Sequence, residues 1–354
     1  MLGIEKKAAR YTWTAALILL LVSCVYLIRE AIIVFAVALL LTYLLYPLFA
    51  VLNRILPGRS RAPALALVYL ILFGIVALMV ITVGSQVAEE ATSLAARAPE
   101  LLNRFQNQTD KVPVPPVAKS FQDQVLDQAR AQLTEHSGQL VSLVPQYSLK
   151  LLSESRYLFL AIVVPIISFF MLKDGGLIRE ELIDLFSTGQ NRELVEDVVS
   201  DIHLLLLQYM RALFALCLAV FGSFALAFGL MRVPDAMLLA TIAFPLEFVP
   251  LVGPMAAAVI IMVVVVVSGY AHPLWVLAFL AIYRLFQDYV LSPNLMAAGM
   301  ELHPLMVIFG VFAGGELGGV AGVFLSVPVL AMARIVIRRI RKERRAEPRH
   351  VAVT

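Results

Sequence analysis

The chain has 354 residues, of which 61% are hydrophobic and 15% charged, and its mean hydropathy is +0.88. Soluble domains carry about 25% charged residues, so this composition excludes an ordinary soluble fold and predicts an integral membrane protein. The net charge is only +3. A basic run near the C-terminus follows an apolar segment, which favours a cytoplasmic anchor at the lipid bilayer over a nucleic-acid surface.

The apolar segments predict an all-α fold. A helix needs about 20 apolar residues to cross the hydrocarbon core. Runs near or above this length predict about eight transmembrane helices, at 12–28, 31–52, 62–84, 153–172, 204–231, 236–268, 273–291 and 304–336. The sixth and eighth runs are too long and too often interrupted to be plain spans. Broken or re-entrant segments are therefore expected in the C-terminal half.

Basic residues predict the orientation. Arg54, Arg59 and Arg61 mark the loop after the second run as cytoplasmic. Both termini are basic as well, so we expect a multi-pass membrane protein with both termini in the cytoplasm. Only Arg29 and Glu30 separate the first two runs, which predicts a tight hairpin between them.

The layout predicts five regions. The polar segment at 85–150 has apolar residues at helical spacing on both sides of "KVPVPP". A small extracytoplasmic helical hairpin is the favoured interpretation, and a lid over a transport path is the alternative. In chain order the regions are a three-span bundle at 1–84, this hairpin at 85–150, a fourth span with a cytoplasmic amphipathic helix at 151–203, a transport core at 204–336 and a basic tail at 337–354.

No catalytic motif is recognisable. The sequence lacks a nucleophile elbow, a phosphate-binding loop and the zinc-protease pattern, and its five histidines are scattered. Cys24 and Cys217 lie in apolar runs, where inert packing is favoured over a disulfide or a metal site. We therefore expect no enzyme activity, no cofactor and no metal.

The stretch "FPLEFVPLVGPMAAAV" places a glutamate among helix breakers. Three prolines within ten residues cannot sit in one regular helix. Freed backbone groups are tolerated at membrane depth only where they face protein or water, so a break indicates a cavity. Glu247 is costly there unless it is hydrated, protonated or paired. A merely kinked helix with Glu247 at the interface is the alternative. The expected hinges are Pro245, Pro250, Gly253 and Pro254.

The stretch "AIYRLFQDYVLSPNL" carries two opposite charges. Arg284 and Asp288 are four residues apart and share a helix face, with Gln287 one position away. They form either a structural pair or, slightly favoured, part of a solute site. Pro293 ends the span and allows both charges to reach the interface by snorkelling.

The stretch "HPLMVIFGVFAGGELGGVAGVFLSVPVLA" places Glu316 among glycines. The glycine spacing alone predicts close helix packing. A run of 33 residues would be about 50 Å long as one helix, whereas the hydrocarbon core of the bilayer is roughly 30 Å thick. Two shorter segments therefore fit better. The glycines flanking Glu316 suit an unwound centre between two half-helices. The remaining expected hinges are Gly299, Pro304, Gly314, Gly315, Gly318, Gly319 and Pro328.

These stretches resemble the AI-2E (autoinducer-2 exporter) transporter family. The resemblance is carried by "PLEFVPLVGP", "FQDYVLSPNLMAAGMELHPL" and "GGELGGVAGVFLSVPVLA", and also by "FFMLKDG" and "LLTYLLYPL". It implies an exporter or permease for a small hydrophilic solute, such as the quorum-sensing signal autoinducer-2. It also implies a homo-oligomer, with a pentamer as the best guess.

Two other functions stay open. A Na⁺ (Li⁺)/H⁺ antiporter would use Glu247, Asp288 and Glu316 as its titrating or coordinating carboxylates. A non-transporting membrane scaffold would use the polar groups only to hold helices together. For a transporter, the predicted translocation path comprises Glu247, Arg284, Gln287, Asp288 and Glu316.

Overall fold

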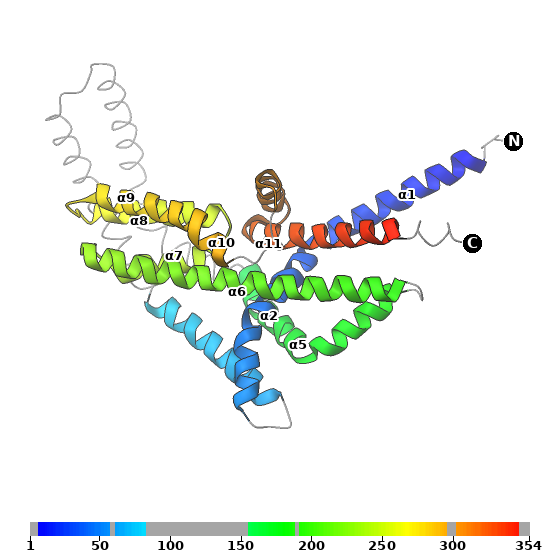
Figure 1. Ribbon diagram of the computed structural model, residues 1–354, viewed down its shortest axis with the longest axis horizontal. Coiled ribbons are helices and arrows are strands. Elements are labelled where there is room, and N and C mark those ends of the chain that lie inside the picture. Colours follow the sequence, from blue (N-terminus) through cyan, green and yellow to red (C-terminus); the bar gives the residue numbers. More distant parts are fainter. Residues whose placement is uncertain (1–5, 57–60, 83–154, 188–190, 296–301, 347–354) are drawn as a thin grey trace, which may run out of the picture. The chain divides into compact units, whose positions relative to one another are not determined.

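A computed structural model describes residues 6–56, 61–82, 155–187, 191–295 and 302–346, and all regular structure within these ranges is helical. The predicted hairpin at 85–150, Gly299 and the tail beyond Ala346 lie outside the described residues. The helices, most of which are labelled in Figure 1, are α1 (Lys6–Leu27), α2 (Arg29–Ile55), Ala62–Thr82, α5 (Ser155–Phe186), α6 (Arg192–Met231), α7 (Ala236–Leu246), α8 (Val252–Val267), α9 (Pro273–Phe286), the π-helix η2 (Gln287–Leu291), α10 (Ser292–Leu295) and α11 (Pro304–Ala346).

The prediction of an all-α polytopic membrane protein is confirmed. Seven of the described helices are long and apolar enough to cross a membrane. The predicted run at 236–268 instead forms α7 and α8, of 11 and 16 residues. Neither reaches the length of about 20 residues that a crossing requires. The expected break at the proline-rich stretch is therefore present.

The hairpin predicted between the first two runs is wrong. Only Ile28 separates α1 from α2, and helical hydrogen bonds continue through it. The Ile28 amide donates to the Cys24 carbonyl at 3.1 Å, and the Ile32 amide donates to the Ile28 carbonyl at 3.0 Å. The chain therefore bends instead of reversing. The Arg29 guanidinium lies 4.1 Å from the centre of the Tyr26 ring, so its charge has a partner within the bent helix.

The chain divides into two compact units. The first comprises Met1–Pro47, Ile162–Met210 and Ala298–Thr354, and the second comprises Leu48–Ala161 and Arg211–Ala297. Buried polar contacts join helices of the first unit. Thr42 Oγ1 of α2 donates to Ser168 Oγ of α5 at 3.1 Å, and Tyr43 of α2 hydrogen-bonds to His203 of α6 at 2.9 Å.

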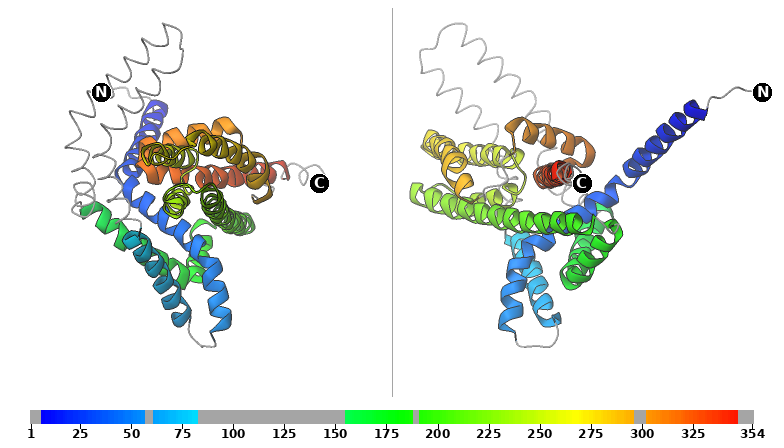
Figure 2. Two further views of the ribbon diagram at one scale, coloured as in Figure 1. Left: turned by 90° about the vertical axis from the view of Figure 1, so that its left-hand side faces the viewer. Right: turned by 45° about the vertical axis from the view of Figure 1, so that its right-hand side comes forward.

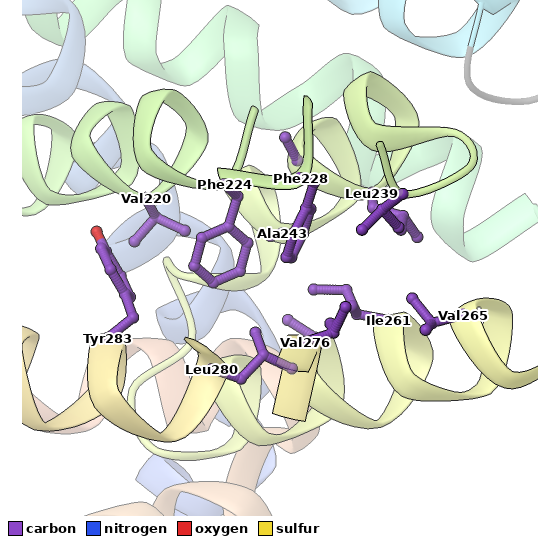
Figure 3. Close-up of a cluster of buried hydrophobic side chains, with 13 residues drawn as sticks. Val220, Phe224, Phe228, Leu239, Ala243, Ile261, Val265, Val276, Leu280 and Tyr283 are labelled. Carbon is purple, nitrogen blue, oxygen red and sulfur yellow. The ribbon is translucent and has the colours of Figure 1, made fainter. Parts of the chain in front are cut away.

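The core of the second unit lies between α6, α7, α8 and α9 (Figure 3). Phe224 is central, because its ring lies 5.1 to 5.6 Å from the rings of Phe228, Phe279 and Tyr283. Such tilted and edge-to-face arrangements are the favoured geometry of aromatic pairs. The buried residues of this core are Val220, Phe224, Phe228, Val233, Leu239, Ala240, Ala243, Ala257, Ile261, Val265, Val276, Leu280 and Tyr283.

Helix α11 folds back on itself, as the glycine-rich stretch predicted. Gly318 and Gly319 leave helical geometry, and Gly319 has a positive φ of 58°. The direction of the chain changes there (Figure 2). Gly314 and Gly322 then lie backbone to backbone, so closely that a Cβ on either would collide with the carbonyl of the other. A straight helix would separate them by about 12 Å. Pro304–Leu317 and Val320–Ala346 are therefore two arms of a helical hairpin.

Gly322→Ala should destabilise this hairpin, because the new methyl group meets backbone that cannot move aside. We expect the free energy of unfolding to fall by about 1–3 kcal/mol, the usual cost of overpacking. Thermal melting of the purified protein in detergent measures the change. Gly222→Ala is the matched control, because Gly222 lies within α6 with open space around its Cα. There alanine should leave the melting temperature unchanged or raise it. Equal melting temperatures for the two variants would contradict the close approach.

Candidate functional site

The turn between α7 and α8 is built from prolines and one glycine. Pro245 lies in the last turn of α7, and Pro250 lies in the connecting segment. Pro254 lies in the first turn of α8, where its missing N–H costs no helical hydrogen bond. Gly253 packs directly on the Leu246 carbonyl, with no room for a Cβ. The hinge residues predicted in this stretch therefore form one tight helical hairpin.

Leu251 holds the tip of this hairpin in a strained conformation. It has a φ of 66° and a ψ of −52°, and the Val252 amide donates to the Pro250 carbonyl at 2.7 Å. This geometry is a γ-turn with positive φ, which is rare and strained for a residue other than glycine. Strain of this kind collects at ligand clamps and switch regions. The tip is therefore a candidate functional segment on conformation alone.

Glu247 and Gln287 form a buried polar pair. Only 6% of Glu247 and 4% of Gln287 are exposed. Gln287 Nε2 donates a hydrogen bond to Glu247 Oε1, joining the end of α7 to the start of η2. An isolated carboxylate is costly to bury, so this carboxyl group needs its amide partner together with a proton or a cation. Of the three conditions that would make Glu247 tolerable, namely hydration, protonation and pairing, the structure shows pairing with a polar group.

The π-helix presents Gln287 to this pair. α9 ends at Phe286, and η2 runs from Gln287 to Leu291 before α10 begins. Insertions of π-helix into α-helices occur frequently at functional sites, because they turn side chains to a new face. Composition and spacing gave no signal for this element. It puts the amide of Gln287 into the core, whereas Asp288 stays partly exposed.

Two buried residues that the sequence analysis did not select lie near Glu247. Cys217 of α6 and Tyr283 of α9 are both within electrostatic range of its carboxyl group. Tyr283 is 7% exposed, and Figure 3 shows its hydroxyl at the edge of the apolar core. Within the part of the chain that the structure describes, this hydroxyl makes no hydrogen bond of ordinary geometry, although Ser223 lies nearby. Its spacing of four residues from Gln287 could have identified Tyr283.

Arg284 and Asp288 form an ion pair, as the structural alternative in the sequence analysis expected, and their part in a solute site stays a prediction. Arg284 Nε lies 3.0 Å from Asp288 Oδ2, and both side chains are partly exposed. Both charges act on Glu247, with Arg284 attracting its carboxylate and Asp288 repelling it. The structure thus brings four of the five predicted path residues together, in two layers: a buried pair of Glu247 and Gln287, and a more exposed pair of Arg284 and Asp288.

Glu316 belongs to the other compact unit. It is exposed, two residues before the bend of α11 at Gly318. Its share in the path stays a prediction. Of the remaining expected hinges, Pro293 lies in α10 and Pro304 begins α11, while Gly315 faces Val323 across the hairpin and Pro328 lies inside the second arm.

The chemistry of the site is that of binding. It offers a carboxyl group, an amide, a tyrosine hydroxyl and an ion pair. Among the described residues, no three histidine, cysteine, aspartate or glutamate side chains gather as metal ligands. Buried polar groups beside broken apolar helices are typical of solute transporters. The fold and the site therefore define a polytopic helical membrane protein of the transporter class.

Comparison with known proteins identifies the family. The model of the AI-2E family transporters matches residues 15–342. The chain therefore belongs to the AI-2E transporter family, as the sequence motifs indicated, and it is a multi-pass membrane permease that contacts the lipid bilayer and moves a solute.

Three relatives illustrate the range of similarity. YueF of Bacillus subtilis is 23% identical over 304 residues, which are 83% of this chain and 81% of YueF. PerM of Escherichia coli is 25% identical over 289 residues, 79% of each chain. The AI-2 transport protein TqsA of Escherichia coli is 32% identical, but over only 99 residues, which are 28% of this chain and 29% of TqsA.

Removing one partner of the buried pair should cost more than removing both. Gln287→Leu leaves the Glu247 carboxyl group buried without its donor, and we expect a loss of about 1–3 kcal/mol in the free energy of unfolding. The double variant Glu247→Leu/Gln287→Leu replaces both groups by apolar ones and should recover most of that loss. Thermal melting of the wild type, both single variants and the double variant gives the coupling energy. A coupling of zero would mean that the two side chains do not interact.

Proposed function

We propose that this protein exports a small hydrophilic solute across the bacterial inner membrane through the site around Glu247, with autoinducer-2 as the first solute to test. The observation that carries the proposal is the buried hydrogen bond between Glu247 and Gln287 at a strained break between two short helices. Ionisable groups buried in a membrane protein are costly and rare, and those that persist usually mark a functional site.

The choice of solute rests on the family and on one relative. The relative TqsA is named as an AI-2 transport protein, and it matches over about a quarter of this chain. The site suits a neutral hydrophilic solute, because a carboxyl group, an amide and a hydroxyl offer both acceptors and donors. The ion pair of Arg284 and Asp288 adds a polar entrance without net charge.

The orientation and assembly follow the sequence. We propose that both termini are cytoplasmic, because both carry basic residues next to apolar spans and such residues are retained on the cytoplasmic side. We further propose that the C-terminal broken helices form the solute path and that the N-terminal helices frame it. The chain works without a cofactor and without catalytic activity. Its copies assemble into a homo-oligomer, with a pentamer as the first stoichiometry to test.

Neutral amide variants test the path. Glu247→Gln, Asp288→Asn and Glu316→Gln should each reduce solute flux by at least tenfold while expression and melting temperature stay near those of the wild type. Flux is measured in proteoliposomes with labelled autoinducer-2 and a panel of small hydrophilic solutes. Glu193→Gln is the control, because Glu193 is exposed in the first turn of α6. Normal transport by all three variants would show that the path lies elsewhere.

A Na⁺ (Li⁺)/H⁺ antiporter is the second candidate, and the buried carboxyl group of Glu247 favours it. A carboxyl group that is shielded from water can hold either a proton or a monovalent cation and exchange one for the other. If this is the activity, adding Na⁺ or Li⁺ to proteoliposomes should release protons, and Glu247→Gln should abolish that release. Solute flux that is independent of both cations and of the proton gradient would contradict it.

A further inference from the structure

The end of α11 combines a basic face with an apolar edge. Between Arg334 and Arg345 the sequence holds seven basic residues and one acidic residue. Arg338, Arg341 and Lys342 are exposed. Ile337 and Ile340, which lie beside Arg341 on the helix surface, are 50% and 39% exposed. This end continues directly from the apolar part of the same helix. Basic residues beside exposed apolar ones are typical of helix segments at a membrane surface.

Two ion pairs of one arginine, Arg339, hold this helix end against α6 and leave its other faces exposed. Arg339 Nε lies 2.7 Å from Asp201 Oδ2, and Arg339 Nη1 lies 2.5 Å from Asp197 Oδ2. Asp197 and Asp201 are four residues apart on α6 and therefore share one face. Ile335, one turn before Arg339, is buried on the same side. Arg339 thus pairs with both carboxylates and holds the helix end in one rotation.

Arg338 and Arg341 lie about 100° and 160° around the helix from Arg339, so Arg341 faces away from these ion pairs, while Arg338 remains within electrostatic range of Asp201. The two exposed arginines are three residues apart, so their Cβ atoms lie about 5–6 Å from each other. Two guanidinium groups at this spacing can share one phosphate, which arginine binds through two parallel hydrogen bonds. The exposed isoleucines beside them suit the boundary between headgroups and acyl chains, and nucleic acid would offer these isoleucines no apolar partner.

We propose that this face, formed by Arg338, Arg341, Lys342, Ile337 and Ile340, binds the phosphate headgroup of anionic phospholipids in the leaflet that α11 enters. The positive charge of this face and its place at the end of an apolar helix favour an anionic lipid as the ligand. Clustered arginines and lysines directly beyond a transmembrane helix attract anionic lipid, and the apolar edge keeps the helix at the interface. The proposal does not depend on which solute the protein carries.

Titration of lipid into the full-length protein in detergent tests this proposal. Native mass spectrometry compares phosphatidylglycerol with phosphatidylcholine for the wild type and for the variant Arg338→Gln/Arg341→Gln/Lys342→Gln. The wild type should prefer phosphatidylglycerol, and the variant should lose about a hundredfold in affinity for it, as the removal of three surface charges near a membrane implies. High salt should weaken binding to the wild type in the same direction.

Two controls separate this surface from a general effect of charge. Arg192→Gln should leave lipid binding unchanged, because Arg192 is already paired with Asp184 and Glu196. Arg338→Lys/Arg341→Lys should keep the electrostatic part of the preference but bind phosphatidylglycerol more weakly than the wild type, because lysine cannot form the two parallel hydrogen bonds of arginine. Unchanged phosphatidylglycerol affinity in the triple variant, or equal affinity of the wild type for the two lipids, would overturn the proposal. Tighter binding of a duplex oligonucleotide than of phosphatidylglycerol at this face would also overturn it.

Discussion

The membrane sets the constraint on which the rest of the structure depends. A polar backbone group has no water partner in the hydrocarbon core, so the chain can leave the helical conformation only where protein or water satisfies it. This protein breaks two of its apolar segments, at Glu247–Leu251 and at Gly318–Gly319. At each break, neighbouring backbone approaches so closely that only glycine fits, at Gly253 in one hairpin and at Gly314 and Gly322 in the other. At the first break, turn hydrogen bonds satisfy freed backbone groups, since the amides of Phe248, Val249 and Gly253 donate to the carbonyls of Pro245, Leu246 and Val249.

The same constraint explains where polar side chains are found. Glu247 and Gln287 meet beside the first break, and Tyr283 adds a buried hydroxyl from the neighbouring helix. The aromatic core around Phe224, to which Tyr283 belongs, packs α6, α7, α8 and α9 together (Figure 3). A transporter needs such a site to be held by rigid helices while the broken segments remain able to rearrange.

Much of this architecture could be predicted from the sequence, because hydrophobic length and helix breakers act locally. The prolines around Glu247 and the glycines around Glu316 gave the two breaks. The contact of Glu247 with Gln287 is different, since it joins residues 40 positions apart and depends on a π-helix whose formation no local pattern indicated. The predicted hairpin between the first two helices was wrong because here the local pattern was misleading. Arg29 and Glu30 suggested a turn, but Arg29 stacks on Tyr26 and the helical hydrogen bonds persist through Ile28.

The conformation of Leu251 has a consequence for the equilibrium between states of the first hairpin. A non-glycine residue held at a positive φ outside the left-handed helical well costs about 1–3 kcal/mol. A second conformation of the tip that returned Leu251 to a negative φ would release this energy. The population of that conformation would then be about 5 to 150 times larger than for a tip with an unstrained residue at the same position. A leucine at residue 251 therefore makes any such rearrangement of the tip less costly in free energy than a glycine would.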